Sequence, residues 1–440
     1  MKRVLQMVLA FSLPVLAACG SASGSSAEVS YKSDPDSQQD SSDNSVGSLA
    51  AFSTAGTIEE TELYNDNGLI ITAKSLEYNN SSVTLNLHFD NSSDTDYSIS
   101  AGSIGYDVNA VNGMMVQDGW IHTDVYAGSS ADEGMDFSYN ALQGVGVDSI
   151  STLEVGFTIT DPDYHSTYTG PLKLTTSLAE PKDRGYEQSV QSKEAQSYFG
   201  YSMKKFDGDV NYQGADFEMK SLAIVETSDG LTALLEVKNN GSEVRIGVIS
   251  DISFNDVVVC SGRWTSDLVN PGDTAVMTFD FDSLLSEEER AAIGMGEIGK
   301  VDFTFDVENS DYDSLNAAAV ISETFGENTS YESNGTEVYN GDNIRILSTG
   351  TSKDKRYFIA GFIVENSGEE HWVDTDNSVS VNGTMVDSYS SSALAEPGKT
   401  YALFVKVSLD DLSEKGITDV TQMDVNFDIG WDTHKVTITY

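Results

Sequence analysis

The amino-acid sequence predicts an all-β protein in which three antiparallel β-sandwich domains follow one another. The first observation is a small turn that occurs three times, as VNGMMV, FNDVVV and VNGTMV. The second is a segment after each turn that alternates strictly between apolar and polar residues, as LEVGFTI, VDFTFDV and MDVNFDI. The third is spacing: the turn residues Asn112, Asn255 and Asn382 lie 143 and 127 residues apart, which suits one compact sandwich each.

Residues 1–18 predict a lipoprotein signal peptide. A basic start precedes an apolar run from Val4 to Leu16, which is too short to be a good membrane-spanning helix. The next residues, LAAC, resemble the lipobox of bacterial lipoproteins, and the resemblance implies cleavage before Cys19 and lipidation of its thiol. We therefore expect an extracytoplasmic protein at the cell surface, held on the cell membrane by the lipid on Cys19. The alternative is an ordinary secretory signal with an incidental cysteine.

Residues 19–57 are rich in Ser, Gly and Asp and almost free of large apolar side chains. Such a segment cannot bury enough surface to offset the entropy lost on ordering. We expect a disordered tether that spans about 30 to 35 Å as a flexible coil.

The chain is strongly acidic, with 24 basic and 70 acidic residues and a formal net charge of −46. This charge opposes binding to nucleic acid and to anionic headgroups, so we expect no nucleic-acid partner. If Cys19 carries a lipid, Cys260 has no second cysteine to pair with inside the chain. Within VVVC, Cys260 is expected to act as a small packing residue, with a mixed disulfide or a covalent dimer as the alternative.

The repeated landmarks divide the rest of the chain into three predicted sandwiches, residues 58–178, 206–322 and 337–440. Residues 179–205 interrupt the pattern and predict a helical linker, or alternatively a segment that docks a partner. Residues 323–336 predict a shorter flexible join.

Each unit repeats the same order of elements. It opens on a tyrosine (Tyr64, Tyr212 and Tyr339), continues with a strand that ends at asparagine, and reaches the repeated turn. Asn-Gly favours the two-residue type I′ turn of a β-hairpin. A short helix should precede the penultimate strand, and Ser286 with Glu289 fits a capping box in the second unit.

The alternating closing segments predict half-buried strands, because every second side chain then faces the core. Several such strands joined by tight turns indicate a two-sheet sandwich of the immunoglobulin-like kind.

The third unit carries the clearest family resemblance. Its landmarks VNG.MVD, PGK, SLDDLSEKGI, MDVNFDI and WDT resemble immunoglobulin-like modules of Gram-positive (Firmicutes-type) surface lipoproteins, which are related to telokin-like domains of secreted bacterial antigens. The first unit departs from this pattern because it lacks the Pro-Gly turn. The resemblance implies a fold and a surface location, and it supplies no catalytic residues.

The sequence offers no catalytic constellation. The five histidines are scattered, and neither a nucleophile elbow nor a phosphate-binding loop is present. We therefore expect neither an enzyme nor a cofactor.

Two sets of residues are candidate binding positions. Aspartates gather in two loops and could hold Ca²⁺, although turn formation explains them equally well: Asp90, Asp94 and Asp96, and Asp374 and Asp376. Three aromatic residues follow the repeated hairpin and could contact a ligand or fill the core: Trp120, Trp264 and Tyr389.

The sequence thus predicts a monomeric surface lipoprotein that displays three sandwich modules and binds or adheres to a protein or glycan. A structural envelope lipoprotein without a specific ligand is the alternative, and a hydrolase is the third.

Overall fold

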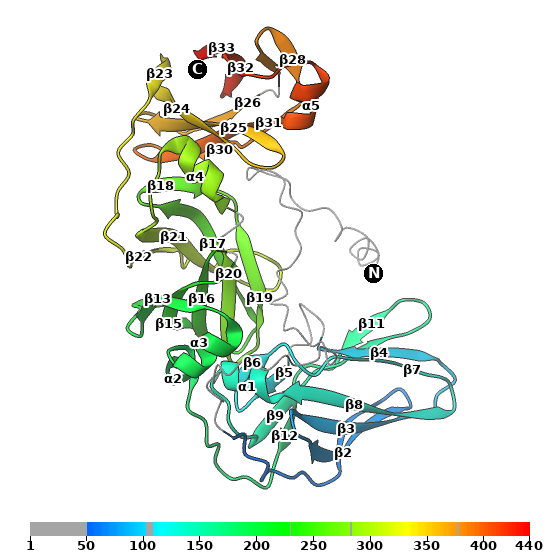
Figure 1. The fold of residues 1–440 in the computed structure, drawn as a ribbon. Coiled ribbons are helices and arrows are strands. Elements are labelled where there is room, and N and C mark those ends of the chain that lie inside the picture. The colour runs from blue at the N-terminus through cyan, green and yellow to red at the C-terminus, as the bar shows by residue number, and fades with distance from the viewer. Residues whose placement is uncertain (1–50, 103–108, 229, 282–283, 376–377) are drawn as a thin grey trace, which may run out of the picture.

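The computed structural model of the chain describes residues 51–102, 109–228, 230–281, 284–375 and 378–440 (Figure 1). Strands account for 54% of it and short helices for 8%, so the predicted all-β sandwich-type fold is confirmed. The predicted signal peptide, Cys19 and the tether up to residue 50 lie outside the described residues. Among the described residues, no helix has the length and apolar character needed to cross a bilayer.

Repeat 1, residues 61–175, is built on three runs of paired strands: β1-β2-β3-β8, β11-β10-β4-β7 and β12-β9-β5-β6. Its strands are β1 (Thr61–Asp66), β2 (Leu69–Tyr78), β3 (Ser82–Asn91), β4 (Tyr97–Ala101), β5 (Asn109–Val111), β6 (Met114–Val116), β7 (Ile121–Val125), β8 (Ser129–Ser138), β9 (Thr152–Val155), β10 (Thr158–Thr160), β11 (Ser166–Tyr168) and β12 (Leu172–Thr175), and its helix is α1 (Tyr139–Gly144).

Repeat 2, residues 202–324, follows the same order with longer, less interrupted strands. Its elements are β13 (Ser202–Asp207), β14 (Tyr212–Gly214), β15 (Phe217–Glu226), β16 (Leu231–Asn239), β17 (Arg245–Phe254), β18 (Val257–Cys260), β19 (Trp264–Val269), β20 (Thr274–Asp280), α4 (Glu287–Ile293), β21 (Lys300–Glu308) and β22 (Ala319–Thr324).

Repeat 3, residues 336–439, ends the chain. Its elements are β23 (Thr336–Gly341), β24 (Ile344–Lys353), β25 (Tyr357–Asn366), β26 (His371–Thr375), β27 (Val379–Val381), β28 (Thr384–Val386), β29 (Ser388–Ser390), β30 (Ala393–Ala395), β31 (Thr400–Ser408), α5 (Leu409–Glu414), β32 (Gln422–Ile429) and β33 (Asp432–Thr439).

The repeated turn is a type I′ hairpin in each repeat, as predicted, because both central residues have positive φ. The asparagine side chain also ties the hairpin to the start of the closing strand. Asn255 Oδ1 accepts backbone N–H bonds from Gly299 (3.0 Å) and Lys300 (3.1 Å), and its Nδ2 donates to the Glu297 carbonyl (3.0 Å). Asn112 and Asn382 make the equivalent bonds in their repeats.

A second asparagine ends a strand that comes before the repeated turn in each repeat: Asn91 on β3, Asn239 on β16 and Asn366 on β25. Asn239 is fully buried, and its Nδ2 donates to the carbonyls of Glu243 and Val269, each at 2.8 Å. Asn91 and Asn366 make the matching pair of bonds in repeats 1 and 3. A buried amide without hydrogen-bond partners would cost about 1–3 kcal/mol. The bonds of these three asparagines avoid that cost and hold each side chain in one position.

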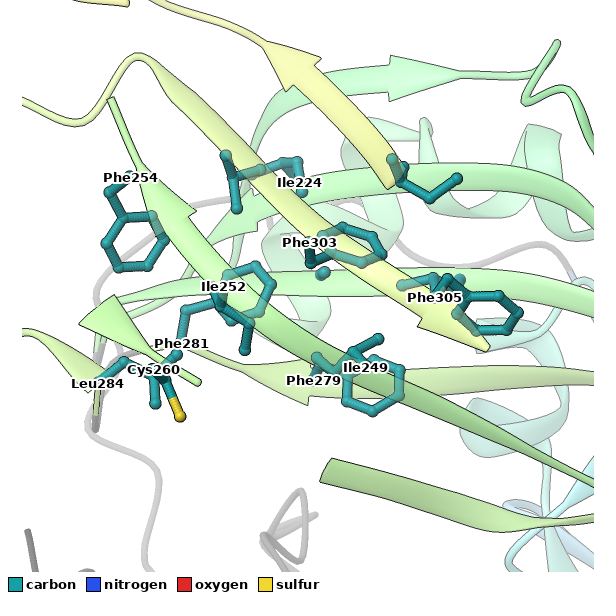
Figure 2. Packing of buried hydrophobic residues seen from close by; sticks show 14 of the residues in the cluster. Ile224, Ile249, Ile252, Phe254, Cys260, Phe279, Phe281, Leu284, Phe303 and Phe305 are labelled. Atoms are coloured by element: carbon teal, nitrogen blue, oxygen red, sulfur yellow. The ribbon is translucent and has the colours of Figure 1, made fainter. Parts of the chain in front are cut away.

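Buried apolar side chains form one large cluster in each repeat. The closing strands supply them as predicted: in β21, Phe303, Phe305 and Val307 are buried, and the residues between them are partly exposed. Figure 2 shows the rings of Phe303 and Phe305 beside Ile249 and Ile252 of the paired strand β17. The side chain of Cys260 is buried in the same cluster.

A short helix precedes the closing strand in every repeat, including repeat 1, where the sequence signal is weak. Ser138, Ser286 and Ser408 occupy the N-cap positions. The predicted capping box of Ser286 and Glu289 is present.

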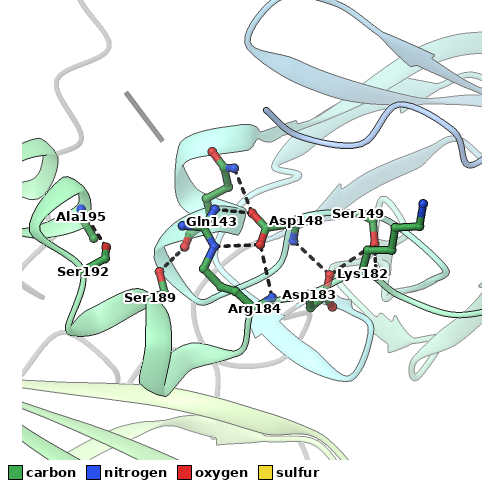
Figure 3. A network of polar contacts seen from close by, with 9 residues as sticks. All are labelled: Gln143, Asp148, Ser149, Lys182, Asp183, Arg184, Ser189, Ser192 and Ala195. Carbon is green, nitrogen blue, oxygen red and sulfur yellow. Dashed lines mark hydrogen bonds and ion pairs between the residues drawn. The ribbon is translucent and has the colours of Figure 1, made fainter. Parts of the chain in front are cut away.

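The linker between repeats 1 and 2 contains two short helices, α2 (Tyr186–Val190) and α3 (Lys193–Phe199). A polar network fixes the residues before α2 to repeat 1 (Figure 3). The Arg184 guanidinium donates to both carboxylate oxygens of Asp148, at 2.8 and 2.5 Å, and Asp183 accepts from the backbone N–H of Asp148 at 3.0 Å. Burial alone would raise the pKa of Asp148, but the hydrogen bonds from Arg184 and Gln143 hold it below its usual range.

Contacts of repeat 1 also begin before residue 58, where the predicted tether should end. The rings of Phe52 and Tyr139 stack with centroids 4.5 Å apart, and the Ser53 N–H donates to the Asp148 carbonyl at 2.8 Å. Because burying an aromatic ring stabilises a contact, the last residues of the predicted tether are part of the folded repeat.

The repeats are joined by parallel strand pairs, which the sequence did not predict. β6 pairs with β20, with Met114 opposite Thr274. β18 pairs with β31, with Val257 opposite Thr400. Two sheets therefore continue from one repeat into the next.

Candidate binding surface

An exposed aromatic residue stands at one equivalent turn of all three repeats. This turn, named here the tip, follows the alternating closing strand. Tyr164 at the tip of repeat 1 is 83% exposed, and Tyr312 at the tip of repeat 2 is 46% exposed. Trp431 at the tip of repeat 3 is fully exposed. A large ring left in water at three equivalent positions is unusual for a packing residue.

The first two tips share one backbone geometry. Asp161 Oδ1 accepts backbone N–H bonds from Asp163 and His165, each at 2.9 Å. Asn309 Oδ1 accepts the same pair of bonds from Asp311 and Asp313, also at 2.9 Å. These side chains hold the turn closed around the aromatic residue.

Tyr164 and Tyr312 both have a φ of 64°, in the left-handed region. A residue with a Cβ is held there at a cost of about 1–3 kcal/mol. Repeats 1 and 2 therefore each maintain a tyrosine where glycine or asparagine would be less strained.

The third tip is a tighter turn of Gly430 and Trp431. The Gly430 N–H donates to the Trp372 carbonyl at 2.9 Å, so the tip lies against β26. Trp372 is itself partly exposed. Burial raises the pKa of the nearby Asp374 carboxyl, although hydrogen bonds from the Thr375 backbone and the Trp372 side chain oppose this. The end of repeat 3 thus presents two indole rings beside hydrogen-bonding groups.

The aromatic residues named from the sequence have different environments. Trp120 and Tyr389 are exposed, whereas Trp264 is partly buried and packs against the core of repeat 2. Tyr389 makes an edge-to-face contact with Tyr357, with ring centroids 5.8 Å apart. Trp120 belongs to repeat 1 and Tyr389 to repeat 3, so the structure does not group the three into one surface.

Two of the candidate calcium residues accept backbone hydrogen bonds. Asp96 accepts the backbone N–H of Ala127 at 2.8 Å, and Asp374 accepts the N–H of Thr375 at 2.7 Å. Asp90 lies on β3 and Asp94 in the loop after it, while Asp376 lies outside the described residues. Within the described ranges, no group of three or more His, Cys, Asp or Glu side chains is arranged to hold a metal ion.

The two carboxyls whose pKa values are raised most, Asp273 and Glu323, lie apart from the tips. Burial raises the pKa of Asp273 to about 6 and that of Glu323 to about 7. Asp273 lies beside the junction of repeats 1 and 2, and Glu323 lies on β22 near Asp207. Nothing in this placement brings two such carboxyls together across a cleft.

Sequence reasoning did not single out the tips, although a signal exists. DPDYHS, NSDYDS and DIGWDT each place an aromatic residue beside aspartate directly after an alternating strand. The repetition becomes evident once the strands are aligned, because the three turns differ in length.

The comparisons with known proteins are weak. No protein family model and no curated protein matches the chain. Red sea bream transglutaminase is 11% identical with a TM-score of 0.17, over 59% of this chain and 31% of that one, so the chain spans about a third of its length. A 1.5-MDa bacterial ice-binding adhesin is 9% identical with a TM-score of 0.13, over 81% and 90% of the two chains. The central fibronectin-III array of RIM-binding protein is 8% identical with a TM-score of 0.14, over 89% and 100%. Similarities at this level carry no argument about function.

Proposed function

We propose that this protein is a lipid-anchored, extracytoplasmic binding protein of the cell surface, whose three repeats display the tip residues Tyr164, Tyr312 and Trp431 to a glycan. The observation that carries the proposal is the recurrence of one exposed ring at the equivalent turn of each repeat. The lipobox-like LAAC with Cys19 supports the anchored location.

The chemistry of the tips suits a neutral sugar better than a protein surface. Tyr164, Tyr312 and Trp431 lie at separate turns of three repeats, whereas protein interfaces usually bury a contiguous patch with aromatic anchors at its centre. Tyr164, Tyr312 and Trp431 are all adjacent in sequence to at least one aspartate or histidine, which can accept or donate hydrogen bonds to hydroxyl groups. The net charge of −46 disfavours an anionic glycan.

Three weak sites on one chain can act together. Linked sites raise the overall affinity by a factor of about 10² to 10⁴ when the ligand spans them. The fixed junctions between repeats support such an arrangement, since they hold the tips in a set order along the chain. The increase in affinity is largest for a repetitive polysaccharide, because one ligand molecule can then occupy all three sites.

The test is a glycan array probed with residues 20–440. This fragment keeps all described residues and lacks the signal peptide and Cys19. Tyr164→Ala, Tyr312→Ala and Trp431→Ala should each weaken binding to the same glycans about tenfold, and the triple variant should lose it. Tyr198→Ala is the matched control, because Tyr198 is as exposed as Tyr312 but lies on α3.

The array also separates the alternatives. Binding that survives in the triple variant would assign the ligand to another surface, such as Trp120 or Tyr389. Binding to proteins but to no glycan would refute the proposal that the ligand is a glycan. Absence of any ligand would favour a structural envelope lipoprotein, for which the fixed junctions supply a rigid spacer.

A further inference from the structure

The two junctions between repeats use equivalent positions in the same register. Met114 and Val257 are each the first residue after the type I′ turn, and each lies opposite the threonine that follows the Gly-containing turn of the next repeat. These threonines are Thr274 and Thr400. One interface is therefore built twice within a single chain.

The residue after this position is an apolar anchor. Met115 and Val258 are both buried, and each belongs to the apolar cluster of the following repeat. Met115 reaches the turn that precedes β20, where the N–H of Asn270 lies 3.4 Å from its sulfur. The hairpin of one repeat thus inserts a side chain beside the turn of the next.

Repeats 1 and 3 each leave one half of this interface unpaired within the part of the chain that the structure describes. Among the residues that the structure describes, β28 pairs with β27 alone and β8 pairs with β3 alone. Met385, at the position of Met115 and Val258, is 57% exposed. Tyr126, at the position of Asn270, is 63% exposed.

We propose that copies of this chain associate head to tail, with β28 of one copy paired in parallel with β8 of the next. Thr384 then lies opposite Ser130, the equivalent of Thr274 and Thr400, and Met385 packs against Tyr126. The occupant is a second copy because each chain carries both halves of an interface that it already forms twice. Such a contact is heterologous, so it extends into open chains unless its rotation closes a ring.

The contact between copies is smaller than the internal junction. Between repeats 2 and 3 the Ala292 carbonyl lies close against Gly350 and Gly361, where a Cβ would come within 3.1 and 2.6 Å of it. At the open ends the equivalent positions are Glu414 on α5 and the Ser75–Asn86 pair on β2 and β3, which are polar. Polar outer faces are typical of terminal repeats.

Two conditions should therefore favour the association. Anchoring many copies on one membrane raises their effective concentration. Salt screens the repulsion between two chains of net charge −46, so association should strengthen as ionic strength rises. This separates it from contacts held by ion pairs, which salt weakens.

Disulfide trapping tests the register. Residues 20–440 are prepared with Thr384→Cys or with Ser130→Cys and oxidised alone and mixed, in high salt. Opposed residues of a strand pair lie within the Cα separation that a disulfide needs. The mixture should give cross-linked dimers at least tenfold above either variant alone, and a chain carrying both substitutions should give a ladder of multimers or a closed ring.

Two controls test whether cross-linking depends on the proposed strand pair. Thr384→Cys mixed with Ser166→Cys, on the exposed strand β11, should stay at background. Met385→Pro removes the outward N–H of β28 and should abolish trapping between positions 384 and 130, while an unchanged melting temperature shows that the repeat still folds. The proposal is overturned if the mixture does not exceed the Ser166→Cys control, or if Thr384→Cys alone dimerises equally well.

Discussion

The backbone N–H of Thr274 donates a 2.8 Å hydrogen bond to the carbonyl oxygen of Gly113, and this bond joins repeat 2 to the hairpin turn of repeat 1. Gly113 has a φ of 76°, as the second residue of the type I′ turn requires. The turn that marks each repeat in the sequence is therefore also the point at which one repeat holds the next.

The asparagine of this turn should contribute strongly to the stability of its repeat. Asn255→Ala removes the acceptor of two backbone N–H groups and a donor to Glu297, at a site that is almost fully buried. We expect a loss of about 2–3 kcal/mol in the free energy of unfolding, measured by urea denaturation. Asn65→Ala, on the exposed strand β1, should cost less than about 0.5 kcal/mol. Equal effects of the two substitutions would contradict the structural role of the turn asparagine.

The junction of repeats 2 and 3 depends on a glycine. A Cβ at Gly361 would lie 2.6 Å from the Ala292 carbonyl oxygen, so Gly361→Ala should push α4 away from β25. We expect proteolysis of residues 325–335 to become about tenfold faster, which corresponds to a loss of about 1.4 kcal/mol in the contact. The control is Gly296→Ala, because a Cβ there meets only one side-chain atom, at 3.4 Å. Cleavage at the wild-type rate in Gly361→Ala would show that α4 does not seal this junction.

Asp273 should make stability depend on pH. Burial raises its pKa to about 6, Glu154 adds to this, and Lys238 and Lys173 oppose it. The folded state then holds a proton that the unfolded state has lost, so stability falls as pH rises from about 4 to about 6. Asp273→Asn should therefore stabilise the protein at pH 7 by about 1–3 kcal/mol and change it little near pH 3.

Thermal unfolding of the Asp273→Asn variant across this pH range is the measurement. Asp124→Asn, on the exposed face of β7, is the control and should leave the profile unchanged. A variant that is destabilised at pH 7 would mean that the ionised Asp273 is stabilising, contrary to its burial and unpaired Oδ2.

The lipid anchor is tested by fractionation. Cys19→Ala should move the protein from the membrane fraction to the supernatant, because it removes the acylated thiol. Cys260→Ala is the matched control and should stay with the membrane. Retention of the Cys19→Ala protein on the membrane would show that some other feature holds it there.

The sequence predicts the parts of the fold that local patterns encode. Phe303 and Phe305 alternate with polar residues, so the buried face of β21 follows from a period of two. The type I′ turns and the helix capped by Ser286 likewise follow from residues within a few positions of one another.

The junctions and the tips lie beyond such patterns. Val258 and Met385 occupy equivalent positions, yet one is buried in the next repeat and the other is exposed. Val258 is buried because it packs into the cluster of repeat 3, a contact between repeats that no local pattern contains. Tyr164 and Trp431 are equivalent only after strands of unequal turn length are aligned, so their shared exposure was missed.

Amide hydrogen exchange at three equivalent residues tests most directly whether the repeats form one array through matching strand pairs. In dilute low-salt solution, the N–H of Thr274 should exchange slowly because it is bonded to the Gly113 carbonyl of repeat 1, and that of Thr400 should do so because Thr400 lies opposite Val257 in the β18–β31 pair. The N–H of Ser130 should exchange fast, because among the described residues β8 pairs with β3 alone. Fast exchange at all three would contradict the array, and with it the fixed order of the tips and the open ends.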